Sequence, residues 1–438
     1  MSISNQKQGE IIRNLGFRKL NEMQKACIEA SKVHDNLLLL APTGSGKTAA
    51  YLLSLLPKLS DRPGVQLLIL APTRELVLQI EQVLRQMKLP FKVNVGYGGH
   101  GFSIERKNFS TPPTILVGTP GRIQDHLERE TFDPNGIDHI VFDEFDKALE
   151  FGFTAQMEYI VGRMRRVKSK LLVSATRAID IPEYLNLRSY ETINFSQEQE
   201  GELSIRQILV EKDEKPNGLL KVLATFRAKE NAIVFVNHRD ACDRISEYLD
   251  IEKVAYSIFH GGLEQDKREL ELTKFRNGSS QILIATDIAA RGIDIPELDY
   301  VIHYQMPHQE NIFTHRNGRT ARMKASGTSI LIRTTTDKVP EYLSEEPETY
   351  VTKANQQMDK PEWVTVYVGK GKKDKVNKID LVGFFLQFDF MQKDDIGLIE
   401  MKDFSAYVAV RRKKSRKLIE QARKLRIKNK VAKIEMAR

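Results

Sequence analysis

The chain has 438 residues, of which 41% are hydrophobic and 29% charged, and its formal net charge is +9. This length predicts two or three domains, and no apolar run reaches the roughly 18 residues that a membrane-spanning helix needs. The polar start MSISNQKQGE lacks the basic-then-apolar order of a signal peptide. The two cysteines, Cys27 and Cys242, lie too far apart in sequence to suggest a disulfide framework or a zinc site. We therefore expect a cytoplasmic protein with no membrane partner.

The positive charge is concentrated at the end of the chain. Residues 361–438 hold 20 Lys and Arg against 10 Asp and Glu, a net +10, so the preceding residues are together close to neutral. A basic module on a near-neutral body indicates a polyanionic partner, most simply nucleic acid. A solvated helix face is the other explanation, and charge alone does not decide between them.

Short apolar runs alternate with helix-period stretches along most of the chain. In the first part the runs are NLLLLAP (36–42), QLLILAP (66–72), TILVGTP (114–120), HIVFDE (139–144) and KLLVSAT (170–176). They recur as NAIVFVNHR (231–239), QILIATD (281–287), YVIHYQMP (300–307) and TSILIRT (328–334). Such runs are typical of buried parallel strands in βαβ units. We predict two α/β domains, at 1–200 and 201–335, followed by a polar linker at 336–361.

The last segment, 362–438, has a different order of elements. It reads strand, helix, strand, strand, basic helix, strand, beginning with WVTVYVG and ending with VAKIEMA. This β-α-β-β-α-β order predicts a small α+β module of the RRM type, a common RNA-binding fold.

The stretch LLLLAPTGSGKTAAYLLSLL, residues 37–56, has the pattern of a phosphate-binding loop between a strand and a helix, with Ala41 in place of the first glycine. Backbone N–H groups at such a helix start cradle phosphate oxygens, the lysine neutralises phosphate charge, and the next hydroxyl binds Mg²⁺. The residues expected to bind a nucleotide in this way are Thr43, Gly44, Ser45, Gly46, Lys47 and Thr48.

Two adjacent acids, Asp143 and Glu144, follow the run HIVF, where an α/β sheet presents ligand-binding groups. An acidic helix start would look the same, but the phosphate-binding loop supplies the matching partner. We expect Asp143 to hold Mg²⁺ together with Thr48, and Glu144 to orient or deprotonate the attacking water.

Eight motifs occur along the chain in a fixed order: APTGSGKT, APTREL, YGG, TPGR, DEFD, SAT, TDIAARGIDIP and HRNGRTAR. In this order and rough spacing the chain resembles the DEAD-box family of ATP-dependent RNA helicases over about residues 14–325. The resemblance implies two tandem RecA-like domains with parallel sheets, and ATP and RNA bound across the cleft between them.

The resemblance also assigns roles in the first domain. Phe17 would stack on adenine and Gln24 would hydrogen-bond its edge, although an aromatic that the family carries further upstream is missing. Asp146, Ser174 and Thr176 would couple hydrolysis to RNA. RNA phosphates would be held by Pro72, Thr73, Arg74, Gly99, Thr119, Pro120, Gly121 and Arg122.

In the second domain the resemblance places Gly292 and Asp294 near the nucleotide and makes Arg319 and Arg322 arginine fingers on the γ-phosphate. Guanidinium groups stabilise charge on a transferring phosphoryl group, which gives this assignment a physical reason. His315 would couple the two sites. The RNA contacts would come from Gln265, Arg268 and Thr286.

Two residues depart from the family pattern. Phe145 stands where the family usually has alanine, and Asn317 stands where it has a β-branched apolar residue. An uncompensated ring at position 145 would strain the strand end by roughly 1–3 kcal/mol. Because the residues with direct chemistry are kept, we interpret Phe145 as a compensated variant.

The tail resembles the RNA-binding domain of the DbpA-like subfamily through VTVYVGKGKKDKV, IGLIEM and AYVAV. Tyr407 occupies one position where an RRM stacks a base, whereas Ser405 occupies another. The basic residues Lys370, Lys372, Lys373 and those from Arg411 to Lys417 would bind phosphates, or else form only a soluble face.

These observations together predict an ATP-dependent RNA helicase that remodels structured RNA. The resemblance implies ribosomal RNA as target and ribosome assembly as setting, with ATP and Mg²⁺ as cofactors. Nothing in the sequence suggests an oligomer seam, so we expect a monomer. An ATP-gated RNA clamp without productive unwinding and a related DNA helicase are the alternatives that the sequence leaves open.

Overall fold

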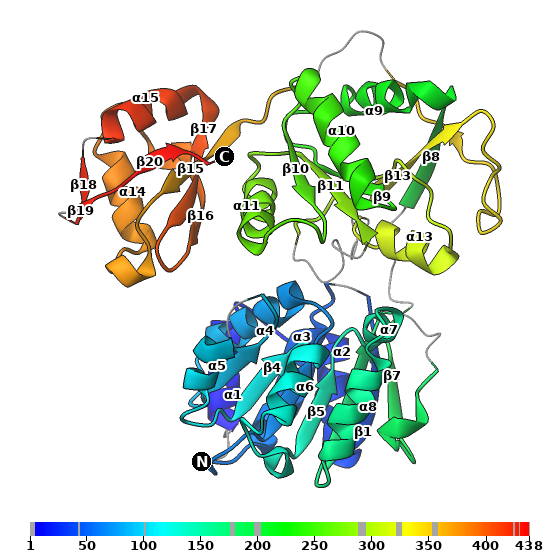
Figure 1. The fold of residues 1–438 in the computed structure, drawn as a ribbon, viewed down its shortest axis with the longest axis vertical. Coiled ribbons are helices and arrows are strands. Elements are labelled where there is room, and N and C mark those ends of the chain that lie inside the picture. The colour runs from blue at the N-terminus through cyan, green and yellow to red at the C-terminus, as the bar shows by residue number, and fades with distance from the viewer. Residues whose placement is uncertain are drawn as a thin grey trace. The chain divides into compact units, whose positions relative to one another are not determined.

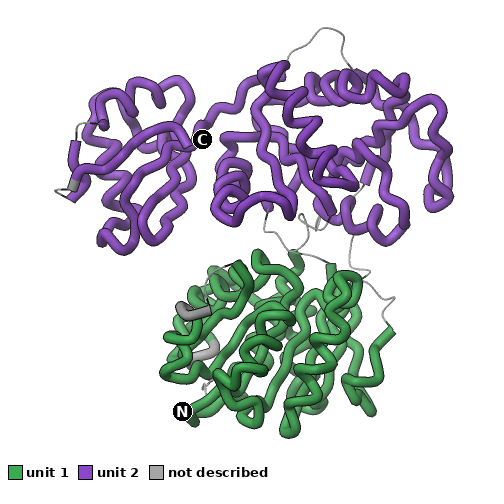
Figure 2. Tube along the Cα trace, viewed as in Figure 1, with its two compact units in different colours: residues 1–200, 292–294 green, residues 201–291, 295–438 purple. Residues whose placement is uncertain are grey.

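The fold is described from a computed structural model, which divides the chain into two compact units, residues 1–200 with 292–294 and the remainder (Figure 2). The structure describes residues 5–42, 44–99, 102–175, 180–196, 203–287, 295–320, 326–352, 358–423, 425–428 and 430–437.

Unit 1 is built on a seven-stranded sheet in the order β3-β4-β2-β5-β6-β1-β7, in which neighbouring strands run parallel. The strands are β1 (Asn36–Leu40), β2 (Leu67–Leu70), β3 (Val93–Gly96), β4 (Ile115–Gly118), β5 (His139–Phe142), β6 (Ser169–Ser174) and β7 (Glu191–Asn194). The helices are α1 (Asn5–Asn14), α2 (Glu22–Val33), α3 (Lys47–Leu55), α4 (Arg74–Gln86), α5 (Phe102–Asn108), α6 (Pro120–Glu128), α7 (Phe145–Glu150) and α8 (Thr154–Arg163).

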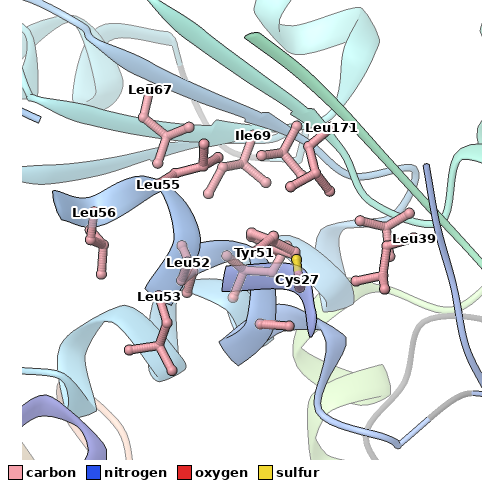
Figure 3. Packing of buried hydrophobic residues seen from close by; sticks show 14 of the residues in the cluster. Cys27, Leu39, Tyr51, Leu52, Leu53, Leu55, Leu56, Leu67, Ile69 and Leu171 are labelled. Carbon is pink, nitrogen blue, oxygen red and sulfur yellow. The ribbon is translucent and has the colours of Figure 1, made fainter. Parts of the chain in front are cut away.

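Both faces of this sheet are buried, because side chains of each strand alternate between two core clusters. Leu37 and Leu39 of β1 pack with α2, α3 and α4, while Leu38 and Leu40 pack with α6 and α8 (Figure 1). Figure 3 shows the first of these clusters, where Tyr51 and Leu52 of α3 lie beside Cys27 and under the strands. Helices on both faces leave the carboxyl ends of the strands as the edge where loops are free to carry function.

Unit 2 contains a second seven-stranded parallel sheet, in the order β10-β11-β9-β12-β13-β8-β14. Its strands are β8 (Leu203–Val210), β9 (Ala232–Val236), β10 (Tyr256–Phe259), β11 (Ile282–Thr286), β12 (Tyr300–His303), β13 (Gly327–Thr334) and β14 (Glu348–Thr349). Its helices are α9 (Lys215–Leu223), α10 (Arg239–Ile251), α11 (Gln265–Arg276) and α13 (Glu310–Asn317).

One buried arginine ties α13 to this second sheet. Arg316 is 1% exposed and donates from Nε and Nη2 to the two carboxylate oxygens of Asp287, at 2.6 and 2.7 Å. It also donates to the Gln305 carbonyl (2.7 Å) and to Asn237 Oδ1 (2.8 Å). The guanidinium is therefore satisfied from several directions, as a buried charge must be.

Asn317 lies next to this arginine and is also buried. Its Oδ1 accepts from His303 Nε2 at 3.0 Å and from Ser329 Oγ at 2.8 Å. Asn317, which replaces the apolar residue of the family pattern, therefore has two buried polar partners. They remove the free-energy cost that a buried amide oxygen without a hydrogen bond would carry.

The tail module, residues 362–438, also belongs to unit 2. Its four-stranded antiparallel sheet has the order β16-β17-β15-β20, which is the strand order of an RRM. The elements are β15 (Trp363–Val368), α14 (Lys378–Leu386), β16 (Ile396–Met401), β17 (Ala406–Arg411), α15 (Arg412–Ala422), the β18–β19 hairpin (Arg426–Ile427 and Lys430–Val431) and β20 (Ile434–Met436). The predicted β-α-β-β-α-β order is confirmed.

The structure adds strands that the apolar runs did not reveal. Strands β3, β7, β8, β10 and β14 extend the two sheets outward from the predicted ones. The stretch expected to be a linker, 336–361, contributes β14, and Tyr350 of this stretch hydrogen-bonds Thr225 at 2.7 Å. Among the described residues, no helix is long and apolar enough to cross a membrane.

His303 makes the stability of unit 2 depend on pH. Burial and the nearby Arg316 lower the pKa of His303 to about 3, against an ordinary value of 6.5. Between these values the unfolded chain binds one more proton than the folded chain, so stability is lost as pH falls below about 6.5. From pH 7 to pH 5 we expect this group to lower the free energy of unfolding by about 2 kcal/mol.

Urea denaturation at several pH values, compared with His303→Gln, measures this effect. The glutamine keeps an amide donor for Asn317 and does not titrate, so its stability should fall less on acidification. A His303 ring that titrates near pH 6.5 in NMR spectra of the folded chain would contradict the prediction.

Candidate nucleotide and RNA site

The loop after β1 forms the start of α3 as the phosphate-binding pattern requires. Gly46 adopts a left-handed conformation (φ 88°) as the N-cap of α3, and Lys47 is the first helical residue. The ammonium of Lys47 folds back to donate to the carbonyl oxygens of Ala41 (2.7 Å) and Pro42 (2.8 Å). The Lys47 ammonium is thus held against the backbone of the loop, and a bound phosphate would compete with these two carbonyls for its hydrogen bonds.

Gln24 and Asn21 connect the start of α2 to this loop. Their side chains and backbones form a reciprocal capping box, with Gln24 N donating to Asn21 Oδ1 at 2.8 Å and Asn21 N to Gln24 Oε1 at 3.0 Å. Asn21 Nδ2 donates to the Ser45 carbonyl at 3.0 Å, and a Cβ added to Gly46 would lie 2.6 Å from Gln24 Nε2. Gln24 is therefore fixed against the phosphate-binding loop, and Phe17 lies half-buried on the preceding segment.

Asp143 lies at the carboxyl end of β5 and is 3% exposed. Its Oδ2 accepts from the Tyr51 hydroxyl of α3 at 3.0 Å, and its Oδ1 accepts from Glu144 N at 3.0 Å. Burial raises the pKa of Asp143, although the nearby Lys47 and the Tyr51 hydrogen bond oppose the rise. The carboxylate thus has two hydrogen-bond donors and one nearby cation to hold it in place.

Glu144, Asp146 and Ser174 lie at or just after the carboxyl ends of β5 and β6. Glu144 takes a left-handed conformation (φ 47°, ψ 51°) as the N-cap of α7, a strained arrangement of the kind found at functional turns. Asp146 is 7% exposed, and Lys147 Nζ lies 3.8 Å from its Oδ2. Ser174 is fully buried at the end of β6, and its carbonyl accepts from Ala41 N at 3.2 Å. These residues therefore converge on the sheet edge that carries the phosphate-binding loop.

Phe145 points into the core and away from this edge. Its ring is fully buried and meets Phe142 edge-on, with ring centroids 5.7 Å apart. It belongs to the core cluster that also contains Met157 and Leu172. The larger side chain is packed, and Asp143 keeps its hydrogen bonds, which agrees with the interpretation of a compensated variant.

The oxygen donors at this edge suit Mg²⁺ that arrives with a nucleotide. Among the described residues, no group of three or more His, Cys, Asp or Glu side chains could hold a metal ion by itself. Thr48 and Asp143 offer a hydroxyl and one carboxylate, and Mg²⁺ is commonly bound by one or two carboxylates together with substrate phosphates. The residues present therefore fit a Mg²⁺–triphosphate complex.

Arg74 marks the expected RNA side of unit 1. It begins α4, whose N-cap Thr73 accepts from Leu76 N at 3.2 Å, and follows Pro72 after β2. A Cβ on Gly99, which has φ 107°, would lie 2.1 Å from Arg74 Nη1. Only glycine therefore allows the guanidinium to rest on this turn.

Arg122 is held beside the same edge by two carboxylates. Thr119 occupies the N-cap position of α6 without a side-chain cap, Pro120 and Gly121 lie in the first turn, and Arg122 follows. Its Nε donates to Glu105 Oε2 at 2.8 Å, and its Nη1 donates to Asp125 Oδ2 at 3.2 Å.

The buried Glu105 also accepts from His126 Nε2 at 2.7 Å. Burial alone would raise the pKa of Glu105, but the hydrogen bonds from His126 and Arg122 outweigh it and hold the pKa below its ordinary value. The orientation of Arg122 is thus fixed by a buried carboxylate.

The predicted residues of unit 2 that the structure describes lie at the carboxyl edge of the second sheet or next to it. Gln265 begins α11, and its Oε1 accepts from Arg268 Nη2 at 2.6 Å. Thr286 ends β11. His315 is half-buried in α13, and Arg319, which follows that helix, is 8% exposed.

In the tail module several basic residues have structural partners. Arg411 lies over the Trp363 ring at 4.2 Å and pairs with Glu362, Lys414 pairs with Asp395 at 2.6 Å, and Lys370 lies 3.3 Å from Asp374. The exposed basic residues of the loop before α14 and of α15 are Lys372, Lys373, Lys375, Lys413, Arg416 and Lys417. Tyr407 is half-buried on the outer face of the sheet, 5.7 Å from the Tyr367 ring.

Five predicted site residues lie outside the described part of the chain: Thr43, Thr176, Gly292, Asp294 and Arg322. Sequence reasoning missed three residues that the structure shows supporting the predicted ones, namely Tyr51, which bonds Asp143, Glu105, which bonds Arg122, and Arg316, which holds α13. Tyr51 sits one helical turn after Lys47, and this spacing was the available signal. Glu105 carried no local signal, because its partners Arg122 and His126 lie 17 and 21 residues away. Arg316 stands inside the motif HRNGRTAR, but its partner Asp287 lies 29 residues away.

The packing of Phe145 predicts that Phe145→Ala destabilises unit 1. Removing a fully buried ring leaves a cavity, so we expect a loss of about 3–5 kcal/mol in the free energy of unfolding. Hydrogen exchange of β5 and β6 peptides in increasing urea measures the change locally. Phe151→Ala, at a half-buried ring of the same segment, should cost less, and a loss below about 1 kcal/mol at Phe145 would contradict the packing argument.

Three protein families match consecutive parts of the chain. They are the DEAD/DEAH box helicase family at residues 21–183, the helicase conserved C-terminal domain at 214–324 and the DbpA RNA binding domain at 365–436. The ATP-dependent RNA helicase DbpA of Escherichia coli (strain K12) is 30% identical, with 97% of this chain and 96% of that protein covered. DbpA of Bacillus subtilis (strain 168) is 28% identical over the same shares of the two chains.

Solved structures agree in fold with the two parallel-sheet domains. Saccharomyces cerevisiae Dbp5 bound to RNA and ADP BeF₃ is similar with a TM-score of 0.68 and 25% identity, covering 76% of this chain and 88% of that one. Mss116p bound to ssRNA and AMP-PNP is similar with a TM-score of 0.66 and 26% identity, covering 76% of this chain and 73% of that one. The predicted architecture of two RecA-like domains with an RRM-like tail is confirmed, and the chain belongs to the DEAD-box family of ATP-dependent RNA helicases, in its DbpA-like group.

Proposed function

We propose that this helicase opens short duplexes within ribosomal RNA during ribosome assembly, acting as a monomer in the cytoplasm with ATP and Mg²⁺. The observation that carries the proposal is the gathering of Lys47, Asp143 and Glu144 at one sheet edge of a chain that ends in a basic RNA-binding module. The first group supplies phosphoryl-transfer chemistry, and the module supplies the attachment to a structured RNA.

Nucleotide binding is assigned to the loop after β1 and to the segment before α2. The triphosphate would draw Lys47 away from the Ala41 and Pro42 carbonyls and onto its β- and γ-oxygens, because a charged acceptor makes the stronger hydrogen bond. Phe17 and Gln24 would select adenine. Gly44, Ser45 and Gly46 would bring backbone N–H groups to the phosphates, as helix N-termini do.

Hydrolysis is assigned to the two acids after β5. Mg²⁺ bound through Thr48, Asp143 and the phosphates would neutralise charge on the triphosphate. Glu144, one residue further, would orient and deprotonate the attacking water. Arg319 and Arg322, with Gly292 and Asp294, would complete the site when the domains close, so that hydrolysis depends on closure. Asp146, Ser174, Thr176 and His315 would transmit that closure to bound RNA.

RNA would be held mainly through its backbone. The expected RNA contacts offer guanidinium, amide and hydroxyl groups suited to phosphate and 2′-hydroxyl oxygens. They are Arg74, Thr119 and Arg122 of unit 1 and Gln265, Arg268 and Thr286 of unit 2. Such contacts read shape and not sequence. Target choice is therefore left to the tail, which would raise the local concentration of the core on its RNA.

Steady-state ATP hydrolysis by the intact chain tests the proposal. We expect stimulation by total ribosomal RNA and none by single-stranded DNA of matched sequence, since only RNA carries the 2′-hydroxyl. Glu144→Gln should lower kcat at least a hundredfold while ATP still binds. ATP-dependent RNA binding without hydrolysis in the unaltered chain would overturn the enzyme assignment and leave a nucleotide-gated clamp.

Tyr51 is expected to position Asp143 for this reaction. Tyr51→Phe removes the 3.0 Å hydrogen bond to Asp143 Oδ2 and leaves the ring in its core position. A hydrogen bond to a charged group contributes about 1.5–3 kcal/mol, so we expect kcat to fall roughly ten- to a hundredfold.

The KM for ATP should change little, and the Mg²⁺ concentration for half-maximal activity should rise. Ser54→Ala is the matched control, because this hydroxyl of the same helix bonds Ala50 and Cys27 instead. An unchanged kcat and Mg²⁺ dependence in Tyr51→Phe would show that Tyr51 is only a core residue.

A further inference from the structure

The outer face of the tail sheet is covered by a helix of the second RecA-like domain. On this face the register places Tyr367 opposite Tyr407, and Tyr407 opposite Glu400, so these three side chains point to the same side. The opposite side chains, Val366 and Val408, lie in the module's own core. An RRM usually stacks bases on this outer face. Here α11 and the turn that follows it lie against the face.

A charged cluster joins α11 to β16. Lys402 Nζ donates to Glu269 Oε2 of α11 at 2.7 Å and pairs with Glu400 Oε1 at 2.7 Å. Thr273, one turn after Glu269, donates from Oγ1 to Glu400 Oε2 at 2.7 Å. Burial alone would raise the pKa of Glu400, but Lys402 and Thr273 outweigh it and hold the pKa below its ordinary value. The cluster is therefore a satisfied, partly buried ion pair across the two domains.

A second, neutral cluster joins the end of α11 to β15. Asn277 Nδ2 donates to Thr365 Oγ1 at 2.9 Å, and Thr365 Oγ1 lies 2.9 Å from Ser279 Oγ. Thr365 is 4% and Asn277 7% exposed. Gly278, between Asn277 and Ser279 in the chain, has a left-handed backbone conformation (φ 74°), and a Cβ added to it would lie 3.3 Å from the Trp363 ring. Buried polar groups that satisfy one another in this way indicate a fitted contact.

The contact also connects two RNA-binding surfaces of the proposed function. The Lys402 carbonyl accepts from Lys372 N at 2.9 Å, which fixes the exposed basic loop of the tail beside the ion pair. On the other side, Glu269 Oε1 accepts from Gln265 Nε2 at 3.2 Å, and Gln265 Oε1 accepts from Arg268. A continuous chain of hydrogen bonds thus runs from the tail loop to the two expected RNA contacts of α11.

We propose that the outer face of the tail sheet is a docking surface for α11, so that the tail and the second RecA-like domain act as one body. Tyr407 then supports docking and is not a base-stacking residue, and RNA held by Lys372 and Lys373 passes directly to Gln265 and Arg268. The docking itself stands on the contacts alone. The path of the RNA rests on the proposed function.

Distance measurements on the intact chain test the docking. The native cysteines Cys27 and Cys242 are buried, so spin labels can be attached at Glu247→Cys on α10 and Ile379→Cys on α14, two exposed positions away from the contact. We expect one narrow distance population without RNA. In Lys402→Glu three carboxylates, those of residues 402, 269 and 400, would lie close together and repel one another. This substitution should therefore broaden or shift the distance population.

Charge exchange makes the test specific. Combining Lys402→Glu with Glu269→Lys should restore the narrow population, because the ion pair re-forms with its sign reversed. Lys393→Glu, a reversal at an exposed position of the same module, should leave the population unchanged. A broad population in the unaltered protein, or an exchange variant no narrower than Lys402→Glu, would overturn the docking.

RNA binding separates this proposal from the proposed function. If the tail sheet is occupied, Tyr407→Ala should change the affinity for total ribosomal RNA less than twofold, whereas Lys372→Glu with Lys373→Glu should weaken it at least tenfold. A large loss in Tyr407→Ala would show that the face binds RNA and would overturn the assignment of Tyr407. Absence of any RNA binding would contradict the proposed function while leaving the distance result to judge the docking.

Discussion

Each parallel sheet buries charged side chains at its carboxyl edge, and the surrounding elements are placed so that these charges are satisfied. Removing one partner from a buried ion pair costs several kcal/mol, so the geometry around such groups is tightly constrained. In unit 1 the constraint is Asp143, which draws its hydrogen bonds from Tyr51 on α3 and from the backbone of Glu144. In unit 2 it is Arg316, whose donors reach the ends of three strands or the loops after them. The strands bring the chemistry together, and the buried charges fix its orientation.

This arrangement explains how a charged site is stable before any ligand binds. Lys47 donates to the carbonyls of Ala41 and Pro42, so its ammonium is satisfied by backbone oxygens of its own loop. A triphosphate offers negatively charged oxygens in their place, and the exchange of neutral acceptors for charged ones favours binding. Arg122, which we propose to contact RNA, is also held before any ligand binds, because its Nε donates to Glu105 and its Nη1 donates to Asp125. Both cations thus have hydrogen-bond acceptors that restrict their side chains before a ligand binds, and Lys47 would exchange its two carbonyl acceptors for phosphate oxygens.

The sequence predicted the parts of the fold that are apolar and continuous. Runs such as LLLL in β1 and AIVFV in β9 are buried on both faces, and so the apolar pattern identifies them. The outer strands β3 and β7 alternate or expose their side chains, as in VNVG and ETIN, and no such run exists to find. The phosphate-binding loop and the acids after β5 were predictable because their spacing is local. Tyr51, Glu105 and the partners of Asn317 depend on tertiary contacts, and a single sequence gives no measure of these.

The basic tail shows why charge composition alone assigns function poorly. Its basic residues divide into three uses that the sequence cannot separate. Arg411 and Lys414 hold the module together, Lys402 joins it to α11, and a third group, which includes Lys372, Lys373, Lys413, Arg416 and Lys417, remains exposed. Only the last group is available to a polyanion. If the module were a free tether, its geometry relative to the core would be random, and it could raise only the local concentration of RNA. Docked through Lys402 and Thr365, it would also fix the direction from which RNA reaches α11, so that the same charges contribute orientation as well as affinity.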